Sequence, residues 1–288
     1  MMRRIGFTYD VKSDVQADAG APSDALAELD YPETIDEIAQ AIASGGFSVE
    51  RIGHVKNLLS RIGSLNVDIV FNLCEGMRGR AREAEVPMLL EMHGVPYVGS
   101  DGLTLSLTLD KAMTKKVFVA DAVPTPKYFV ADETTKLDAD CRGMKFPMFV
   151  KPRQEGSSKG ISEDSIVADK KTLKARIEEI HRLYKQPALV EEFIRGVEFT
   201  VLVIGNGAQV EALAPVQISI AGKLIAGELV YTSRRLTGDE ILYVCPAKIS
   251  KALDKALRAA AIKAYQSVDC RDFGRVDFRT DSRGRVYV

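Results

Sequence analysis

A lysine-tipped apolar segment followed by a small polar loop is where this sequence first points to chemistry. The segment FPMFVK, residues 146–151, is typical of a buried strand that ends on Lys151. The loop EGSSKG, residues 155–160, then supplies two glycines, two hydroxyls and a second lysine. Backbone N–H groups in such a loop, beside a lysine, are suited to holding phosphate. A hairpin turn with a solvated lysine has the same composition, so the flanking sequence must decide.

A second charged segment is equally open to two interpretations. The loop CEGMRGRAREA, residues 74–84, carries Arg78, Arg80 and Arg82. Guanidinium groups bind carboxylates in a bidentate way, so this loop suits an anion or carboxylate clamp. The alternative is a solvated basic turn, because most charged side chains are simply exposed.

The elements that must position these loops differ along the chain. Up to Gly94, apolar strands alternate with amphipathic helices, which indicates an open, mostly parallel α/β sheet. The expected strands are residues 4–9, 47–52 and 68–73, and the expected helices begin near Pro32, Val55 and Arg82. No G-x-G-x-x-G run follows the first strand, so a dinucleotide site of the Rossmann kind is not supported.

Beyond residue 100 the pattern changes to longer helices and β-rich segments. We expect helices at 103–119, 169–183 and 250–268, strands at 127–131 and 188–194, a β-rich region over 198–228, and a closing hairpin of 273–280 with 285–288. The chain is therefore predicted to be α/β in class, and α+β in part.

The composition excludes several classes of partner. The chain has 288 residues, with 39 basic and 40 acidic side chains, so neither sign dominates as it would for binding nucleic acid or an anionic membrane. No apolar run has the length of a membrane span, and the start, MMRRIGFTYD, lacks the apolar region of a signal peptide. The four cysteines show no C-x-x-C spacing, which favours reduced thiols in a cytoplasmic protein.

Five separated motifs occur in an order that resembles the ATP-grasp superfamily, and within it the D-alanine–D-alanine ligases. They are GVPYVGSD…LTLDKAMTKK, FVKPRQEGSSKGI, LVEEFIRGVEFTV, the tripeptide Cys245-Pro246-Ala247, and GRVDF. Agreement of five motifs carries far more weight than one short match. The resemblance covers residues 68–288. It implies an ATP-grasp fold with an N-terminal open parallel α/β domain (1–103), a central small β+α subdomain (104–195) and a β-rich C-terminal subdomain (196–288).

The resemblance implies a role for each charged group. Two lysines would hold the nucleotide phosphates as point charges, and the Gly/Ser loop would close over them. The strip 191–194 would line the adenine, and Glu198 would accept hydrogen bonds from the ribose. The implied nucleotide-binding residues are Lys111, Lys151, Glu155, Gly156, Ser157, Ser158, Glu191, Glu192, Phe193, Ile194 and Glu198.

The implied catalytic residues are Arg275 and Ser157. Arg275 would stabilise the negative oxygen that develops during acyl transfer. Asp277 would ligate magnesium, since a hard cation takes carboxylate oxygen. Arg275 and Asp277 also lie two apart on one strand face, where they could form an exposed ion pair worth at most about 1 kcal/mol.

The activity implied is an ATP-dependent, ADP-forming ligation of a carboxylate to an amine through an acyl phosphate, joining two amino acids. ATP and Mg²⁺ would be required, with Mn²⁺ as an alternative metal. The expected partners are ATP and small amino-acid or carboxylate substrates, and a homodimer follows only by analogy. A catalytically impaired ATP-grasp protein that binds nucleotide or amino acid without turnover is the alternative, and phosphorylation of a small acid is a third.

Three departures from the family leave the substrate pair open. No early glutamate that would position the first amino acid can be placed. Arg235 and Leu236 stand where the ligases have a lysine–tyrosine pair in the lid, and Leu236 cannot hydrogen-bond as tyrosine does. The sequence stops at Val288, before the glutamate and asparagine that complete the family's metal site. We therefore expect a shortened sequence of a genuine ligase.

Overall fold

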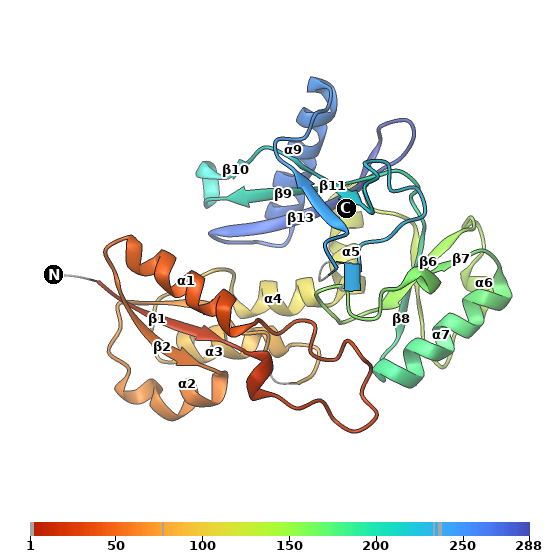
Figure 1. Cartoon of the computed structure of the whole chain (residues 1–288). Coiled ribbons are helices and arrows are strands. Elements are labelled where there is room, and N and C mark those ends of the chain that lie inside the picture. Colours follow the sequence, from red (N-terminus) through yellow and green to blue (C-terminus); the bar gives the residue numbers. More distant parts are fainter. Residues whose placement is uncertain (1–2, 77, 233, 236–237) are drawn as a thin grey trace. The chain divides into compact units, whose positions relative to one another are not determined.

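The computed structural model describes residues 3–288 except 77, 233 and 236–237, so the lid residue Leu236 lies outside the described residues (Figure 1). Two compact units form. Unit 1 comprises residues 1–109 with 270–272, and unit 2 comprises residues 110–269 with 273–288. One parallel and two antiparallel sheets confirm the mixed α/β class. The domain bounds 1–103, 104–195 and 196–288 stay a prediction.

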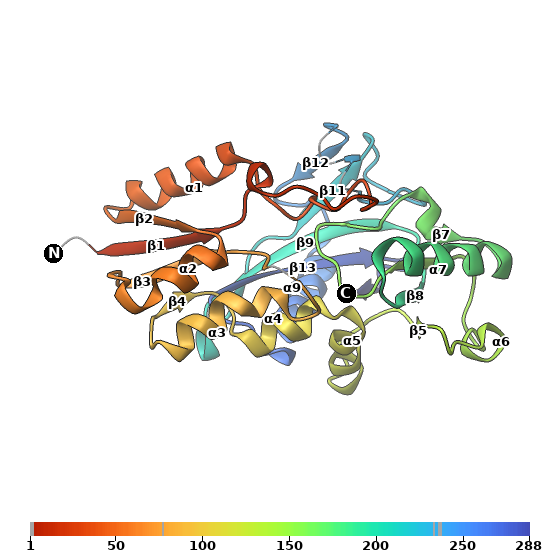
Figure 2. The same ribbon diagram turned by 90° about the horizontal axis from the view of Figure 1, so that it is seen from below.

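Unit 1 is built on the expected parallel sheet. Its strands, in spatial order, are β2 (Ser48–Gly53), β1 (Arg4–Tyr9), β3 (Ile69–Leu73) and β4 (Tyr97–Val98). Its helices are α1 (Pro32–Ser44), α2 (Val55–Arg61), α3 (Glu85–Met92) and α4 (Gly102–Leu109), with short 3-10 turns at 12–14, 62–64 and 82–84. Helix α1 lies on one face of this sheet, and α2 and α3 lie on the other (Figure 2). Val70 belongs to the buried cluster with residues of α2 and α3, whereas its neighbour Phe71 packs with residues of α1, because successive strand residues face opposite sides.

Unit 2 contains two antiparallel sheets. The first has the order β5 (Tyr128–Ala131), β8 (Ala188–Glu192), β6 (Met148–Pro152), β7 (Ile166–Val167). The second has the order β12 (Ile241–Val244), β11 (Val216–Ile220), β9 (Val197–Ile204), β13 (Phe273–Thr280), β14 (Val286–Tyr287), with β10 (Glu211–Ala212) beside β9. The helices are α5 (Lys111–Ala120), α6 (Leu137–Asp140), α7 (Lys170–Tyr184) and α9 (Lys251–Ser267), with 3-10 turns at 163–165 and 207–209.

The predicted helix over 103–119 is two helices, α4 and α5, so this prediction was wrong in its continuity. Asp110 separates them and accepts a hydrogen bond from the Met113 N–H at 3.1 Å. Aspartate is a preferred N-cap, because its short side chain satisfies a backbone donor at the start of a helix. The break places Lys111 in the first turn of α5, where it precedes Lys115 by one helical turn.

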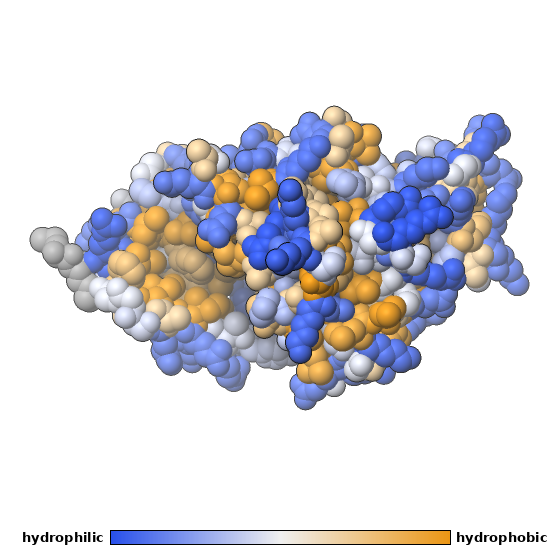
Figure 3. All heavy atoms as spheres, turned by 90° about the horizontal axis from the view of Figure 1, so that it is seen from above, coloured by the Kyte–Doolittle hydropathy of each residue, from blue (hydrophilic) through white to orange (hydrophobic). Residues whose placement is uncertain are grey.

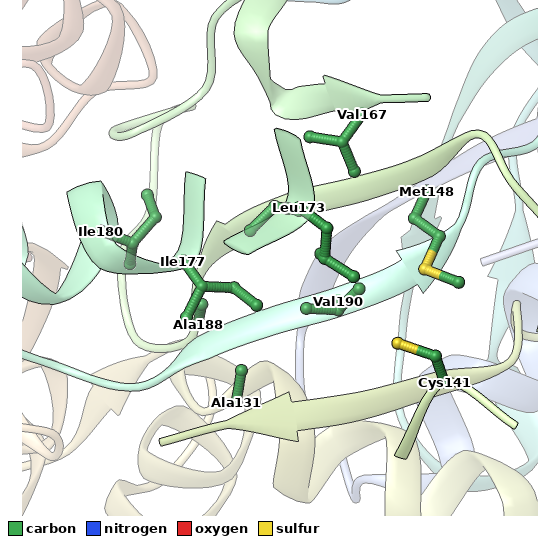
Figure 4. Packing of buried hydrophobic residues seen from close by; sticks show 10 residues of the cluster. Ala131, Cys141, Met148, Val167, Leu173, Ile177, Ile180, Ala188 and Val190 are labelled. Atoms are coloured by element: carbon green, nitrogen blue, oxygen red, sulfur yellow. The ribbon is translucent and has the colours of Figure 1, made fainter. Parts of the chain in front are cut away.

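The core of the first sheet explains why Lys151 is available for chemistry. Leu173 and Ile177 of α7 belong to one buried cluster with Met148 of β6 (Figure 4). Val150 of β6 belongs to the same cluster. Side chains alternate along a strand, so Phe149 and Lys151 of β6 turn to the opposite face. The same alternation puts Val190 in the core and Glu191 on that opposite face.

The second sheet is covered by α9 on one face. Phe199, Val201 and Val203 of β9 are buried, and α9 packs along β9 and β13. Glu198 and Thr200 alternate with them and therefore occupy the face away from these buried residues. No helix in the described ranges is long and apolar enough to cross a membrane. Hydrophilic and hydrophobic side chains are interspersed over the face that Figure 3 displays.

Replacing Gly196 by alanine tests the close approach between β9 and β13. A Cβ at Gly196 would lie 1.8 Å from the Thr280 carbonyl oxygen, which belongs to the paired strand and cannot move alone. We expect Gly196→Ala to lower the free energy of unfolding by at least about 2 kcal/mol in urea titrations. Gly63→Ala is the matched control, because a Cβ there meets open space. Equal stability of the two variants would contradict the prediction.

Candidate active site

A buried carboxylate holds two lysines on the open face of the first sheet. Glu191 lies directly opposite Phe149 of β6 and Tyr128 of β5. Its Oε1 is 2.5 Å from the Lys115 Nζ, and its Oε2 is 2.7 Å from the Lys151 Nζ. The Glu191 side chain is 8% exposed, whereas Lys151 keeps 20% of its side chain accessible. Lys151 is thus oriented by Glu191 while its ammonium group can still reach a ligand.

The electrostatics of this triad keep Glu191 ionised. Burial alone would raise the pKa of Glu191, but the Lys115 and Lys151 ammonium groups lower it to about 2. Burial lowers the pKa of Lys115, and the Glu191 carboxylate opposes that shift. Two cations share one anion, so the site keeps an excess positive charge that suits a polyanion.

The Gly/Ser loop at 155–160 is fixed at its base. The Lys111 Nζ donates a hydrogen bond to the Glu155 carbonyl oxygen. The Glu155 carboxylate pairs with Lys159 at 2.6 Å and accepts a hydrogen bond from the Gln186 Nε2 at 2.7 Å. Lys111 and Lys151 therefore both lie near the start of the loop 155–160, and their role as phosphate ligands stays a prediction.

The tip of this loop has an unusual backbone. Ser157 and Ser158 have φ values of 43° and 60°, and the Lys159 N–H donates to the Gly156 carbonyl oxygen at 2.9 Å. Positive φ at both central residues is the mark of a type I′ turn, which normally takes glycine or asparagine. Non-glycine residues in this region cost roughly 1–2 kcal/mol each. Such strain is concentrated at ligand clamps, which favours a binding role for the loop.

Residues 192–194, which follow Glu191, make three different kinds of interaction. The Phe193 ring stacks on Phe149 with centroids 5.9 Å apart and an interplanar angle of 20°. The Glu192 carboxylate accepts a hydrogen bond from the Lys145 N–H at 3.0 Å. The N–H groups of Glu192 and Phe193 bind backbone carbonyls, whereas the Ile194 N–H has no partner among the residues described. An aromatic surface beside an available N–H is suited to a flat heteroaromatic base.

Three side chains of β13 share one face of the second sheet. The register opposes Arg275 to Leu202, Asp277 to Thr200 and Arg279 to Glu198. Arg275 and Asp277 form the exposed ion pair that was the alternative to their implied roles, through two contacts of 3.0 and 3.1 Å, with side chains 63% and 59% exposed. The Asp277 carboxylate raises the pKa of Arg275.

Glu198 is a half-buried carboxylate with unused hydrogen-bonding capacity. Its side chain is 13% exposed and lies 3.2 Å from the Arg279 Nε, in a geometry that makes no hydrogen bond. Within the described part of the chain no other group donates to this carboxylate. Burial raises the pKa of Glu198, and the Arg279 guanidinium works against that shift. Hydroxyl groups of a ligand would supply the missing donors.

The arginine-rich loop of unit 1 is only partly a surface turn. The Arg82 side chain is buried and pairs with Glu28 at 2.6 Å, and Gly76 packs on the Arg82 backbone. The Asp10 carboxylate accepts hydrogen bonds from the N–H groups of Glu75 and Gly76. For Arg82 the solvated interpretation was therefore wrong, because an opposing buried glutamate compensates its charge.

The comparisons with known proteins identify the family of this chain. The sequence model of the family described as "D-ala D-ala ligase C-terminus" matches residues 119–288. The chain belongs to the D-alanine–D-alanine ligase family. A D-alanine–D-alanine ligase of Carboxydothermus hydrogenoformans is 34% identical over 262 residues, which cover 88% of this chain and 80% of that protein.

The fold prediction is confirmed by solved structures. A Bacillus anthracis D-alanine–D-alanine ligase in complex with ATP superposes with a TM-score of 0.72 at 21% identity, covering 99% of this chain and 84% of that one. The ATP-grasp fold predicted from the motifs is therefore shown. The protein y4sG of Sinorhizobium fredii is 38% identical over 220 residues, which cover 76% of this chain and 63% of y4sG. The chain thus spans less than two thirds of the length of y4sG.

Two residues of the site, Lys115 and Arg279, are not among the residues predicted from the sequence. Lys115 lies one turn from Lys111, a spacing that places both side chains on one helix face. Arg279 continues the alternation of Arg275 and Asp277, so its position on the same strand face could have been inferred. Neither pattern predicts the carboxylate partner, which is Glu191 for Lys115 and Glu198 for Arg279.

Replacing Glu191 by glutamine tests the buried triad through its pH dependence. The lysines lower the pKa of Glu191 from 4.5 to about 2 on folding. A carboxylate with a lowered pKa contributes stability that is complete above its ordinary pKa and is lost as the pH falls through the folded value. We expect Glu191→Gln to be less stable than the wild type at neutral pH. The difference should shrink between pH 4.5 and about 2.

The measurement is the free energy of unfolding of both proteins across this pH range. Glu178→Gln is the control, because the Glu178 side chain is 65% exposed and its ion pair with Lys174 is long, at 3.8 Å. A stability difference for Glu191→Gln that is the same at every pH would show that the triad does not hold the carboxylate ionised.

Proposed function

We propose that the protein is an ATP-dependent ligase that joins the carboxylate of one amino acid to the amine of another, with ADP and phosphate as products. The observation that carries the proposal is the Glu191 carboxylate, which presents Lys151 beside the strained loop 155–160. Family membership supports it independently. Because the relatives are named D-alanine–D-alanine ligases, two D-alanines are the first substrate pair to test.

ATP would occupy the space between the two sheets of unit 2. Lys111 and Lys151 would hold its phosphates, with N–H groups of the loop around Ser157 and Ser158 above them. The base would lie on Phe193, beside the Ile194 N–H, as the aromatic surface and the available donor favour. The ribose hydroxyls would donate to the Glu198 carboxylate, which lacks other donors among the described residues.

The reaction then needs no nucleophile from the protein. A substrate carboxylate oxygen attacks the γ-phosphorus of ATP, and the bond from this phosphorus to the bridging oxygen breaks to release ADP. The amine of the second substrate attacks the acyl phosphate carbonyl, and phosphate leaves with its bonding electrons. Positioning and charge neutralisation supply the rate. Arg275, exposed on the β13 face, would stabilise the carbonyl oxygen as it becomes negative.

Magnesium fits this site only in part. Within the ranges described, no group of three or more metal-ligating side chains comes together. Asp277 offers one carboxylate, held by Thr200 at 2.7 Å and by Arg275. One carboxylate together with substrate phosphates is a usual protein contribution to Mg²⁺ binding. Asp277 would therefore hold a metal ion that arrives with the nucleotide, where it would neutralise phosphate charge.

Two further proposals concern the setting of the enzyme. All four cysteines are free thiols, which supports a cytoplasmic location. A homodimer is proposed by analogy with the family alone.

Phosphate release tests the proposed reaction. The purified protein is incubated with ATP, Mg²⁺ and pairs drawn from D- and L-amino acids. We expect phosphate release that requires both amino acids and matches the dipeptide formed, measured by mass spectrometry. Nucleotide binding without release for every pair would reject the ligase and favour an impaired ATP-grasp protein. ADP formation with the phosphoryl group transferred to the acid, without free phosphate and with no need for an amine, would favour a kinase.

Replacing Lys151 by alanine tests the phosphate site. Loss of one charge-assisted contact should weaken ATP binding at least about tenfold. Calorimetric titration with ATP measures the affinity directly, without turnover. Glu191 keeps Lys115 as a partner, so the fold should persist. Lys174→Ala is the control, because this exposed lysine lies on α7. Unchanged ATP affinity in Lys151→Ala would refute the phosphate role of Lys151.

A further inference from the structure

Arg279 joins two parts of the proposed nucleotide site that the sequence motifs keep apart. Its guanidinium carbon lies 4.6 Å from the centre of the Phe193 ring, which is the proposed base surface. Its Nε is 3.2 Å from Oε1 of Glu198, the proposed ribose acceptor. Its Nη2 donates a hydrogen bond to the Leu229 carbonyl oxygen at 3.0 Å. Only 17% of the Arg279 side chain is exposed.

These contacts fix the guanidinium in one orientation. The Phe193 ring limits its tilt, since a planar cation is attracted to the face of an aromatic ring. The Leu229 carbonyl takes one Nη donor, and the strand register places the Arg279 side chain directly opposite Glu198. A lysine could supply the charge at this point, but its flexible stem would not be held by the ring in the same way.

The geometry leaves the Glu198 carboxylate paired but not saturated. The contact with Arg279 is close enough for an ion pair and too poorly aligned for a hydrogen bond. A buried anion without a counter-charge would be expelled or protonated, whereas a fully hydrogen-bonded one would have no lone pair to offer. Arg279 therefore holds the Glu198 carboxylate ionised and in a fixed place, and leaves its oxygen atoms able to accept hydrogen bonds from a ligand.

We propose that Arg279 is a specificity-determining positioning residue that holds Glu198 as the acceptor for both ribose hydroxyls, so that the site discriminates against deoxynucleotides. This inference rests on the proposed nucleotide site and goes beyond it by assigning sugar selectivity to an ion pair across β9 and β13. Arg279 acts through Glu198 and does not take part in the chemical step.

A purely structural role for Arg279 predicts a different result. The bond to Leu229 alone would make Arg279 an anchor for the connection between β11 and β12. Its loss would then weaken the binding of all nucleotides by the same factor. Selectivity for the sugar separates the two roles, because only the contact with Glu198 bears on the ribose.

The experiment compares ATP, 2′-deoxy-ATP and 3′-deoxy-ATP by calorimetric titration, in the absence of amino-acid substrates. The wild type is expected to bind ATP at least about tenfold more tightly than either deoxynucleotide, since each lost hydroxyl leaves a charged acceptor with one donor fewer. In Arg279→Met this preference should fall to about threefold or less. Arg279→Lys, which retains the charge, should recover an intermediate preference.

Two further variants complete the comparison. Glu198→Gln should lose the preference as Arg279→Met does, and combining both changes should cause little further loss. Arg195→Met is the matched control, because Arg195 pairs with Glu228 on the surface, with side chains 58% and 61% exposed. It should keep the wild-type preference. Circular dichroism establishes that each variant is folded, and Arg279→Lys carries the test if the methionine variant is not.

The outcomes separate this inference from the proposed function. A folded Arg279→Met protein that keeps the wild-type preference would overturn the role of Arg279. A wild type that binds all three nucleotides equally would do the same, while leaving the nucleotide site intact. A wild type that binds no nucleotide at all would overturn the proposed function, and the inference with it.

Discussion

The contact between one buried carboxylate and two ammonium groups is the constraint on which the rest of the proposed site depends. Glu191 brings together α5, β6 and β8, three elements from separate parts of the sequence. Breaking a buried pair costs several kcal/mol, whereas its net contribution to stability is often small. The main effect of this triad is therefore to position the lysine side chains, and not to stabilise the fold. It holds Lys151 against the sheet and leaves a net cation where the loop 155–160 begins.

The two sheets of unit 2 each leave a charged group available to a ligand, but by different pairings. In the first sheet, a carboxylate is surrounded by cations, so that a positive charge remains for the ligand. In the second, Glu198 is paired with a single misaligned guanidinium, so that an acceptor remains. Each sheet buries its apolar residues against one helix, α7 or α9, and presents its charged residues on the other face. Simple strand alternation is enough to sort core from chemistry.

Much of this could be predicted from sequence because it depends on local patterns. The apolar run FPMFVK located strand β6 with Lys151 near its end, and strand and helix signals located the parallel sheet of unit 1. The break at Asp110 was missed because apolar residues continue at helical spacing on both sides, and the capping side chain competes with that pattern. The burial of Arg82 and Lys115 could not be predicted for another reason. Their burial depends on Glu28 and Glu191, more than fifty residues distant in sequence, and no local pattern reports such a partner.

The register of β13 limits how this family member can change over evolution. Arg275, Asp277 and Arg279 occupy alternate positions opposite Leu202, Thr200 and Glu198. A substitution at one position alters one interaction and leaves the others in place. Inserting or deleting a single residue upstream in the strand would instead turn all three side chains toward α9 and bring apolar residues to the ligand face. Single substitutions can therefore change the side chains of β13 one at a time, whereas insertions and deletions within the strand are excluded by the alternation of its side chains.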